Sequence, residues 1–136
     1  MPSCVFCQIA AGRAPAHLVL DEPDRLAFLD ARPVFRGHVL LIPRRHVDTL
    51  VDLPAGEVGP YFEAAQRLAA AVERAMGADG TFVGINNKVS QSVPHLHLHI
   101  VPRKFKDGLR GFFWPRTPYA TDADAEATAA AIRSAL

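Results

Sequence analysis

Several residue types and patterns are scarce in this sequence, and each scarcity excludes a class of protein. Its 136 residues include only two cysteines, Cys4 and Cys7, which are too few for a disulfide framework. No stretch approaches the about 18 uninterrupted apolar residues of a membrane-spanning helix, and the N-terminus lacks the layout of a signal peptide. The formal net charge is +1, which implies no bulk attraction to nucleic acid or to a membrane. We therefore expect a cytoplasmic protein with neither kind of partner.

What is present is the composition of a globular protein, with 49% hydrophobic and 21% charged residues in a length that suits one domain. Apolar periodicity and turn residues predict a short helix at residues 4–12, strands at 17–21, 25–30, 37–43, 81–86 and 94–101, a long helix at 57–76 and a final helix at 122–135. The long helix has an apolar stripe before a capping Gly77, formed by Phe62, Ala65, Ala69, Val72 and Met76. Short turns between strands indicate an antiparallel sheet, so the fold class is α+β.

Three of the six histidines fall at alternate positions of one predicted strand: His95, His97 and His99. Because side chains alternate between the two faces of a strand, the three imidazoles share one face, and Leu96 and Leu98 point to the other. Imidazole suits proton transfer, nucleophilic attack and metal binding near neutral pH, whereas an ordinary exposed strand uses Thr, Lys or Glu. This strand is therefore the first candidate for a functional site.

The segment His-Leu-His-Leu-His-Ile-Val, preceded by Gln91-Ser92-Val93 and followed by Pro102-Arg103, resembles the signature of the histidine triad (HIT) superfamily of nucleotide hydrolases and transferases. The resemblance covers most of residues 3–115. It implies a HIT-like fold, with a five-stranded antiparallel sheet, one long helix packed on it, a short N-terminal helix and a C-terminal helix. It also implies a single HIT domain over residues 1–136, with a core at about 3–103 and a tail at 104–136, that commonly forms a homodimer through the long helix and the fourth strand.

The resemblance assigns the chemistry to the histidines and to the loop before them. His97 matches the family nucleophile, which attacks the α-phosphate of a nucleotide and forms a nucleotidyl-histidine intermediate, from which water releases a nucleoside monophosphate. His99 matches a residue that hydrogen-bonds the phosphate oxygens or the leaving group, and His38 matches one that supports His97 by hydrogen bonding. Gln91 and Ser92 match hydrogen-bond donors to the transition state. The implied substrates are dinucleoside polyphosphates or nucleoside phosphoramidates.

The same resemblance implies a nucleoside pocket in the first part of the chain. Asp30 matches the carboxylate that accepts hydrogen bonds from the ribose hydroxyls, and a carboxylate suits two vicinal hydroxyls. Phe6, Ile9 and Phe28 match apolar positions that line the base pocket, and plain core packing is the alternative explanation for them. A purine preference is implied by the family alone, because no residue here reads the identity of the base.

An asparagine before the phosphate loop contacts the phosphate or the leaving group in the family. Here Asn86 and Asn87 are adjacent, and Asn87 is the preferred candidate. Many family members carry a glycine before the glutamine, whereas this chain has Ser90 at that position. The departure leaves the geometry of this loop open.

Cys4 and Cys7 have the spacing of a metal-binding or redox pair, and they do not follow a strand as a thioredoxin-like motif would. Together with His46 and His95 they would make a Cys2His2 set suited to a tetrahedral structural zinc ion. A branch of the HIT superfamily carries such a site and uses the first triad histidine as a ligand. The resemblance therefore implies a structural Zn2+, and the alternative is a pair of buried free cysteines.

Two other functions are compatible with the same residues. The first is a zinc metallohydrolase in which His95, His97 and His99 together hold one catalytic metal with an open position. The second is a non-catalytic nucleotide-binding module that keeps the fold. The presence of Gln91 and Ser92 together with the histidines argues against this second alternative.

The tail after the triad is rich in basic and aromatic residues. The basic residues could guide a polyphosphate chain or form a solvated loop: Arg103, Lys104, Lys106, Arg110 and Arg116. The segment at residues 112–115 is too apolar for an idle exposed loop. Its Trp114 resembles a tryptophan that contacts the partner subunit near the active site in some family members.

Overall fold

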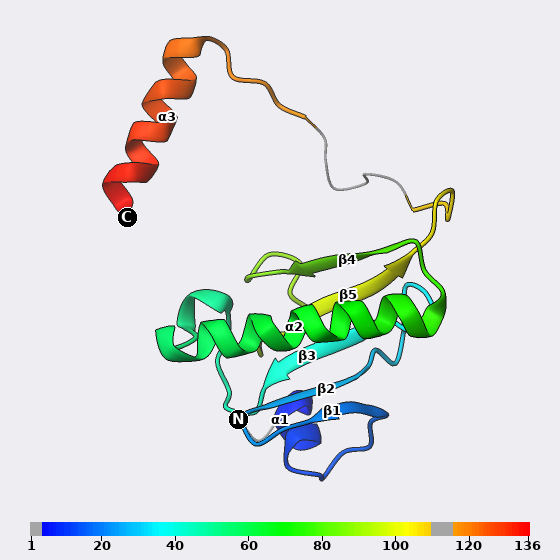
Figure 1. Ribbon diagram of the computed structural model, residues 1–136. Coiled ribbons are helices and arrows are strands. Elements are labelled where there is room, and N and C mark those ends of the chain that lie inside the picture. The colour runs from blue at the N-terminus through cyan, green and yellow to red at the C-terminus, as the bar shows by residue number, and fades with distance from the viewer. Residues whose placement is uncertain (1–3, 110–115) are drawn as a thin grey trace.

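The structure is a computed structural model, and it describes residues 4–109 and 116–136. The elements follow in this order (Figure 1): α1 (Val5–Ala10), β1 (Leu18–Asp21), β2 (Arg25–Leu29), β3 (Val39–Pro43), a single 3-10 turn η1 (Leu50–Asp52), α2 (Ala55–Met76), β4 (Gly80–Ile85), β5 (Leu98–Arg103) and α3 (Asp122–Ala135). The strands form one antiparallel sheet in the order β1-β2-β3-β5-β4. The predicted α+β class and five-stranded sheet with a long helix on it are confirmed.

β3 lies at the centre of the sheet because its apolar run suits burial on both faces. All five of its residues are buried, and it pairs with β2 on one side and with β5 on the other. The β1–β2 hairpin turns tightly, with the Glu22 N–H donating to the Arg25 carbonyl oxygen at 3.0 Å. β4, the other partner of β5, forms an edge of the sheet.

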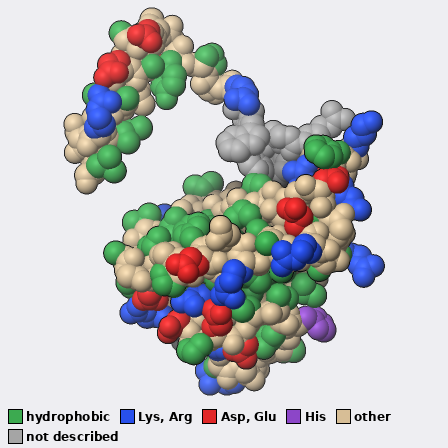
Figure 2. Space-filling view, viewed as in Figure 1, with side chains coloured by type: hydrophobic (Ala, Val, Ile, Leu, Met, Phe, Trp, Pro, Cys, Tyr) green, Lys and Arg blue, Asp and Glu red, His purple; other side chains and the backbone are tan. Residues whose placement is uncertain are grey.

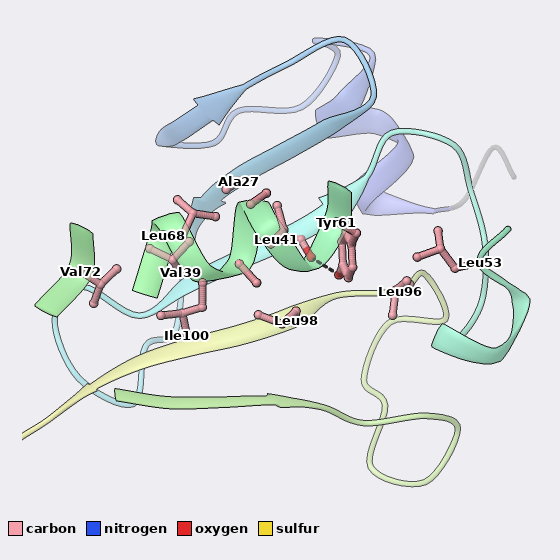
Figure 3. Close-up of a cluster of buried hydrophobic side chains, with 12 residues drawn as sticks. Ala27, Val39, Leu41, Leu53, Tyr61, Leu68, Val72, Leu96, Leu98 and Ile100 are labelled. Atoms are coloured by element: carbon pink, nitrogen blue, oxygen red, sulfur yellow. Dashed lines mark hydrogen bonds between the residues drawn. The ribbon is translucent and has the colours of Figure 1, made fainter. Parts of the chain in front are cut away.

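The main core lies between the sheet and α2 (Figure 3). Tyr61 and Leu68 of α2 pack there with Leu41 of β3 and Leu98 of β5. The Tyr61 hydroxyl donates a hydrogen bond to the Leu41 carbonyl oxygen at 2.8 Å, so this large buried side chain keeps its polar group satisfied. The contact ties α2 to the central strand.

A smaller apolar cluster covers the opposite face of the sheet beneath α1. Phe6 of α1 meets Phe28 of β2 edge-on, with the ring centroids 5.4 Å apart. Leu40 and Ile42 of β3 belong to this cluster, whereas Leu41 between them belongs to the core under α2. The alternation along one strand therefore serves two cores on opposite faces.

The last strand begins later than predicted, at Leu98 rather than at residue 94. The reason is that the preceding backbone hydrogen-bonds elsewhere: the Leu96 N–H donates to the Val47 carbonyl oxygen and the His95 N–H to the Val93 carbonyl oxygen, both at 2.8 Å. The predicted alternation of faces still holds, since Leu96 and Leu98 both lie in the core beneath α2.

The long helix begins at Ala55, two residues before its predicted start, and ends as predicted. Gly77 caps it in the left-handed conformation, with φ of 58°. The predicted apolar stripe is partly wrong, because Phe62 is 39% exposed. The helix buries Tyr61 and Leu68 instead, which shifts the inward face by about one residue.

The C-terminal helix stands apart from the body of the molecule (Figures 1 and 2). Thr121 caps its N-terminus, with the hydroxyl accepting a hydrogen bond from the Asp124 N–H at 3.0 Å. No residue of α3 is buried. Within the described ranges, no helix combines the length and the apolar character that a membrane crossing requires.

Candidate functional site

The histidines form a row on the sheet face opposite α2. Phe6 of α1 lies edge-on against His97, with the ring centroids 5.1 Å apart. The ring centroids of His97 and His99 are 5.0 Å apart, and those of His99 and His38 are 5.2 Å apart. Asp30, just after β2, continues the row beyond His38. The sequence-predicted catalytic histidines and the predicted ribose-binding carboxylate are thus neighbours.

The hydrogen bond of His97 defines its tautomer. Its Nδ1 lies 2.8 Å from the backbone carbonyl oxygen of His95, which can only accept. Nδ1 therefore carries the proton, and Nε2 of the neutral ring keeps a free lone pair. The edge-on contact with Phe6 further restricts the orientation of the ring. This is the arrangement that a nucleophilic imidazole requires.

A second chain of hydrogen bonds defines the tautomer of His99. The Val34 N–H donates to Nδ1 of His38 at 3.1 Å, so His38 must carry its proton on Nε2. That proton is donated to Nδ1 of His99 at 2.9 Å, which leaves the proton of His99 on its own Nε2. His99 can therefore donate a hydrogen bond toward a ligand. The hydrogen bond of His38 thus goes to His99 rather than directly to His97, and the support of His97 by His38 stays a prediction.

Both histidines of this relay are neutral near pH 7. Burial lowers the pKa of His99 to about 4, and repulsion from His97 and His38 adds to the effect. Burial also lowers the pKa of His38, whereas the Asp30 carboxylate opposes this shift. The relay from the Val34 N–H through His38 to His99 therefore determines which nitrogen of each neutral ring carries the proton, and it does not carry a positive charge.

Asp30 is held by its own turn. Its Oδ1 accepts the Arg32 N–H at 2.9 Å, as in an Asx turn. Its Oδ2 lies 3.6 Å from Nε2 of His38, which is beyond a normal hydrogen bond. The side chain is 23% exposed, so Oδ2 can meet a ligand without first breaking a strong contact.

Asp30, His38 and His99 also have the composition of a metal site, since their donor atoms lie within 4.8 Å of one another. The tautomers argue against that use. A metal on Nε2 of His38 would move the proton of that ring to Nδ1, where it would face the Val34 N–H. Two donors would then oppose each other, so the geometry favours a hydrogen-bond relay.

The four predicted zinc ligands converge on one point. Sγ of Cys4 lies 3.4 Å from Nδ1 of His95, and Sγ of Cys7 lies 3.2 Å from Nδ1 of His46 and 3.5 Å from Nδ1 of His95. A tetrahedron with Zn–S bonds of about 2.3 Å and Zn–N bonds of about 2.0–2.1 Å has S–N edges of about 3.5 Å. The observed distances therefore fit a tetrahedral zinc ion.

The outer contacts of these ligands orient the histidine nitrogens toward the cysteines. Nε2 of His95 donates to the Pro43 carbonyl oxygen at 2.8 Å, and Nε2 of His46 contacts Oδ1 of Asp48 at 2.9 Å. The Nδ1 lone pairs are thus directed at the sulfur atoms, as in metal sites with ordered outer contacts. Since both ring nitrogens of His95 are engaged here, it cannot share a metal with His97 and His99. The geometry does not support the three-histidine metallohydrolase.

The loop before the triad, residues 87–92, is held by its own side chains. Nε2 of Gln91 donates to the Asp48 carbonyl oxygen at 2.6 Å, and its Oε1 accepts the Lys88 N–H at 2.8 Å. Oδ1 of Asn87 accepts the Leu50 N–H at 3.0 Å. Both side chains therefore bind backbone groups rather than projecting freely from the loop.

Ser92 is exposed, and the described residues include no hydrogen-bond partner for its hydroxyl. Asn86 is exposed as well. Sequence reasoning missed Asp48, which contacts both the predicted zinc ligand His46 and the loop. A carboxylate two residues after His46 was the signal that could have identified it, because ligating histidines commonly donate their second N–H to such a group.

The three predicted base-pocket residues differ in burial. Phe6 and Phe28 are buried, at 7% and 3% exposure, and both belong to the cluster under α1. Ile9 is half-buried at the margin of that cluster. Of the three, Ile9 has the most exposed surface for a ligand, whereas Phe6 packs edge-on against the His97 ring.

Among the described basic residues after the triad, Arg103 has the best defined side-chain contacts. Arg103 ends β5, and its guanidinium binds the Asp107 carboxylate at 2.6 and 3.1 Å and the Leu109 carbonyl oxygen at 2.8 Å. Lys104, Lys106 and Arg116 are exposed. Arg103 is therefore engaged in shaping its own turn. Arg110 and the segment at 112–115, with Trp114, lie outside the described residues.

Comparison with known proteins agrees with this geometry. A family model described as the HIT domain matches residues 11–106. The chain belongs to the HIT family. An uncharacterised HIT-like protein of Mycobacterium tuberculosis is 39% identical to this HIT protein over 138 residues, covering 98% of this chain and 92% of that protein. The crystal structure of a HIT-family protein from Bacillus subtilis matches it with a TM-score of 0.90 at 32% identity, covering 98% of this chain and 97% of that one.

Other relatives of this HIT protein bear on the metal and on the activity. A zinc-bound histidine triad family protein from Mycobacterium smegmatis has a TM-score of 0.75 and 37% identity, with 99% of each chain covered. An adenosine 5′-monophosphoramidase of Schizosaccharomyces pombe is 32% identical over 122 residues, covering 88% of this chain and 89% of that enzyme. Relatives named as nucleotide hydrolases thus occur in the family, and residues able to bind a metal are present here.

Proposed function

We propose that this HIT protein is a nucleotide hydrolase that cleaves at the α-phosphorus through a covalent intermediate on His97. The observation that carries the proposal is the hydrogen bond from Nδ1 of His97 to the His95 carbonyl oxygen, which leaves Nε2 unprotonated. The presence of relatives named as nucleotide-cleaving enzymes supports the same class of reaction. The substrate is a nucleoside phosphoramidate or a dinucleoside polyphosphate.

The reaction proceeds in two displacements. Nε2 of His97 forms a bond to the α-phosphorus, and the bond to the leaving group breaks with its electron pair passing to that group, which takes up a proton from solvent when it leaves as an amine. The His95 carbonyl oxygen, which accepts a hydrogen bond from the Nδ1–H of His97, stabilises the positive charge that develops on the ring. Water then attacks phosphorus, the electron pair of the P–N bond returns to His97, and the proton of water passes to solvent. The product is a nucleoside monophosphate.

The remaining residues of the row bind and orient the nucleotide. His99, with its proton on Nε2, donates to a phosphoryl oxygen or to the leaving group. Oδ2 of Asp30 accepts from the ribose hydroxyls, and the apolar cluster of Phe6, Ile9 and Phe28 lies under a base, preferably a purine. On the phosphate side, Ser92 donates directly, while Gln91 and Asn87 hold the loop in shape.

We further propose that Cys4, Cys7, His46 and His95 hold a structural zinc ion. Zinc would supply cross-linking between α1, the segment after β3 and the triad, which stabilises the fold. The zinc-bound relative and the tetrahedral spacing support this assignment. A homodimer through α2 and the edge strand β4 is also proposed, where Phe62 and Val83 are exposed apolar residues.

Product analysis tests the proposed activity. The protein is incubated with adenosine 5′-phosphoramidate and with diadenosine tetraphosphate, each with and without inorganic phosphate, and products are separated by chromatography. AMP released without phosphate, together with an adenylylated peptide containing His97 after acid-free quenching, is the expected result. ADP formed only with added phosphate would instead identify a phosphorylase. Absence of turnover with AMP binding retained would refute the hydrolase and favour a binding module.

A further inference from the structure

The segment at residues 46–50 touches both the zinc ligands and the loop at residues 87–92. It contributes the ligand His46, and its Val47 carbonyl oxygen accepts the Leu96 N–H at 2.8 Å beside the triad. At its end, the Leu50 N–H donates to Oδ1 of Asn87 in the loop at 3.0 Å. The same five residues therefore connect two parts of the site that are distant in the sequence.

Asp48 makes the central contacts of this segment. Its carboxylate Oδ1 lies 2.9 Å from Nε2 of His46, the nitrogen that faces away from the cysteines. Its carbonyl oxygen accepts from Nε2 of Gln91 at 2.6 Å. The Asp48 side chain is 64% exposed, so burial does not account for its position, and the contact with His46 does.

The loop needs such an external contact because its backbone is strained. Lys88 and Ser90 have backbone φ of 66° and 61°, in the left-handed region that residues other than glycine rarely adopt. The Gln91 side chain spans this stretch, accepting the Lys88 N–H while it donates to Asp48. The position of the Asp48 backbone therefore helps to set the shape of the strained loop.

We propose that Asp48 is a positioning residue that couples the zinc ligands to the phosphate-side loop. Its carboxylate orients His46 for the metal, and the backbone position that this contact fixes presents the carbonyl oxygen that holds Gln91. The assignment of the loop to the phosphate rests on the proposed function; the coupling does not. Binding of zinc orders the loop, and disturbance of the zinc ligands loosens it.

Zinc affinity is the first test. In the full chain, Asp48→Ala is compared with the wild type and with Asp24→Ala by competition for zinc with a chelating dye. Asp24 is a matched control, since it is exposed and its carbonyl oxygen also accepts an N–H, from Arg44 at 3.0 Å, while the described residues offer its carboxylate no hydrogen bond. Asp48→Ala should bind zinc about 10- to 100-fold more weakly, as expected for loss of an outer contact. Asp24→Ala should match the wild type.

Amide hydrogen exchange at residues 87–92 is the second test, and it needs no turnover. Removal of zinc should speed exchange of the Lys88 amide in the wild type and in Asp24→Ala by about two- to tenfold, the effect of losing one hydrogen bond. In Asp48→Ala the loop should exchange rapidly with or without zinc. Gln91→Leu should show the same rapid exchange, and its zinc affinity should fall by no more than about two- to tenfold, because coupling between two sites is reciprocal. This result would place Gln91 between Asp48 and the loop.

Wild-type zinc affinity and an intact zinc effect on loop exchange in Asp48→Ala would overturn the coupling. General unfolding is distinguished in two ways. Circular dichroism reports any loss of secondary structure, and hydrogen exchange would show that a merely destabilised variant loses protection throughout the chain rather than at the loop alone. Failure of the proposed function has a different signature. In that case no substrate is turned over by the wild type, while the zinc effect on the Lys88 amide is still present.

Discussion

Replacing His38 by Phe tests the relay that defines the tautomer of His99. The aromatic ring fills the same buried position, but it neither accepts the Val34 N–H nor donates to Nδ1 of His99, which are contacts of 3.1 and 2.9 Å. Without that donor, His99 can also adopt the form protonated on Nδ1, in which Nε2 no longer donates to the substrate. His38→Gln is the matched variant, since its amide retains one acceptor and one donor.

The magnitude follows from the one hydrogen bond that selects the tautomer. A net value of about 0.5–1.5 kcal/mol corresponds to a change of about two- to thirteenfold in the ratio of the two tautomers. We therefore expect kcat to fall by no more than about tenfold in His38→Phe, with partial recovery in His38→Gln. The main effect should be on kcat rather than on nucleotide binding, because His99 is proposed to act on the reacting phosphate or leaving group.

Two measurements check this reasoning. Turnover of adenosine 5′-phosphoramidate is followed by chromatography, and the tautomers of His99 are read from the nitrogen chemical shifts of the imidazole ring by NMR. The wild type should show a single form with the proton on Nε2, and His38→Phe should show a mixture. An unchanged His99 tautomer in His38→Phe would refute the relay. A loss of activity as complete as that of a nucleophile variant would show that His38 takes part in the chemistry itself.

Three further predictions concern the nucleophile, the zinc ligands and pH. His97→Ala should abolish turnover yet retain AMP binding by calorimetry, and residual turnover at the wild-type rate would disprove its role. Cys4→Ser should lose zinc by elemental analysis and melt at a lower temperature, while the serine can still cap α1 as the Cys4 sulfur does; unchanged zinc content would contradict the assignment. Because the pKa of His99 is about 4 in the folded protein and that of His38 is also lowered, the unfolded chain binds more protons below about pH 6.5, so stability should fall as the pH drops toward 4. Urea melts at about pH 7 and about pH 5 check this, and they are made on Cys4→Ser because a variant without zinc cannot lose stability through zinc release. Equal urea midpoints at the two pH values would contradict the lowered pKa values of the two histidines.

The alternation of histidine and leucine was enough to predict which side of the sheet each residue faces. His97 turned toward α1 and Leu96 toward α2, because a period of two leaves no other arrangement once one face is buried. The start of β5 was less predictable. Whether Leu96 pairs within the sheet or with Val47 depends on the path of a distant segment, which no local pattern encodes.

Partners within the site were harder to predict than the members of the site. The resemblance brought His38 close to the triad, but only the register of β3 against β5 decides that its ring meets His99 rather than His97. Gln91 was expected to face the phosphate, and its side chain instead binds the backbone on both sides. Side-chain amides form such contacts according to loop conformation, and the positive φ of Lys88 was not visible in the sequence.

The strand order has a consequence for how the chain is made. β5 is the last strand in the sequence, yet it lies between β3 and β4. During synthesis the inner edge of the fully buried β3 stays unpaired until residues 98–103 emerge, and an unpaired apolar edge is prone to aggregation. His95 is synthesised just before this segment, so neither the set of proposed zinc ligands nor the histidine row is complete before it. A chain that ends before β5 therefore exposes an aggregation-prone strand edge and lacks the histidine row. Pairing of β5 removes the exposed edge of β3 and completes the candidate active site in the same step.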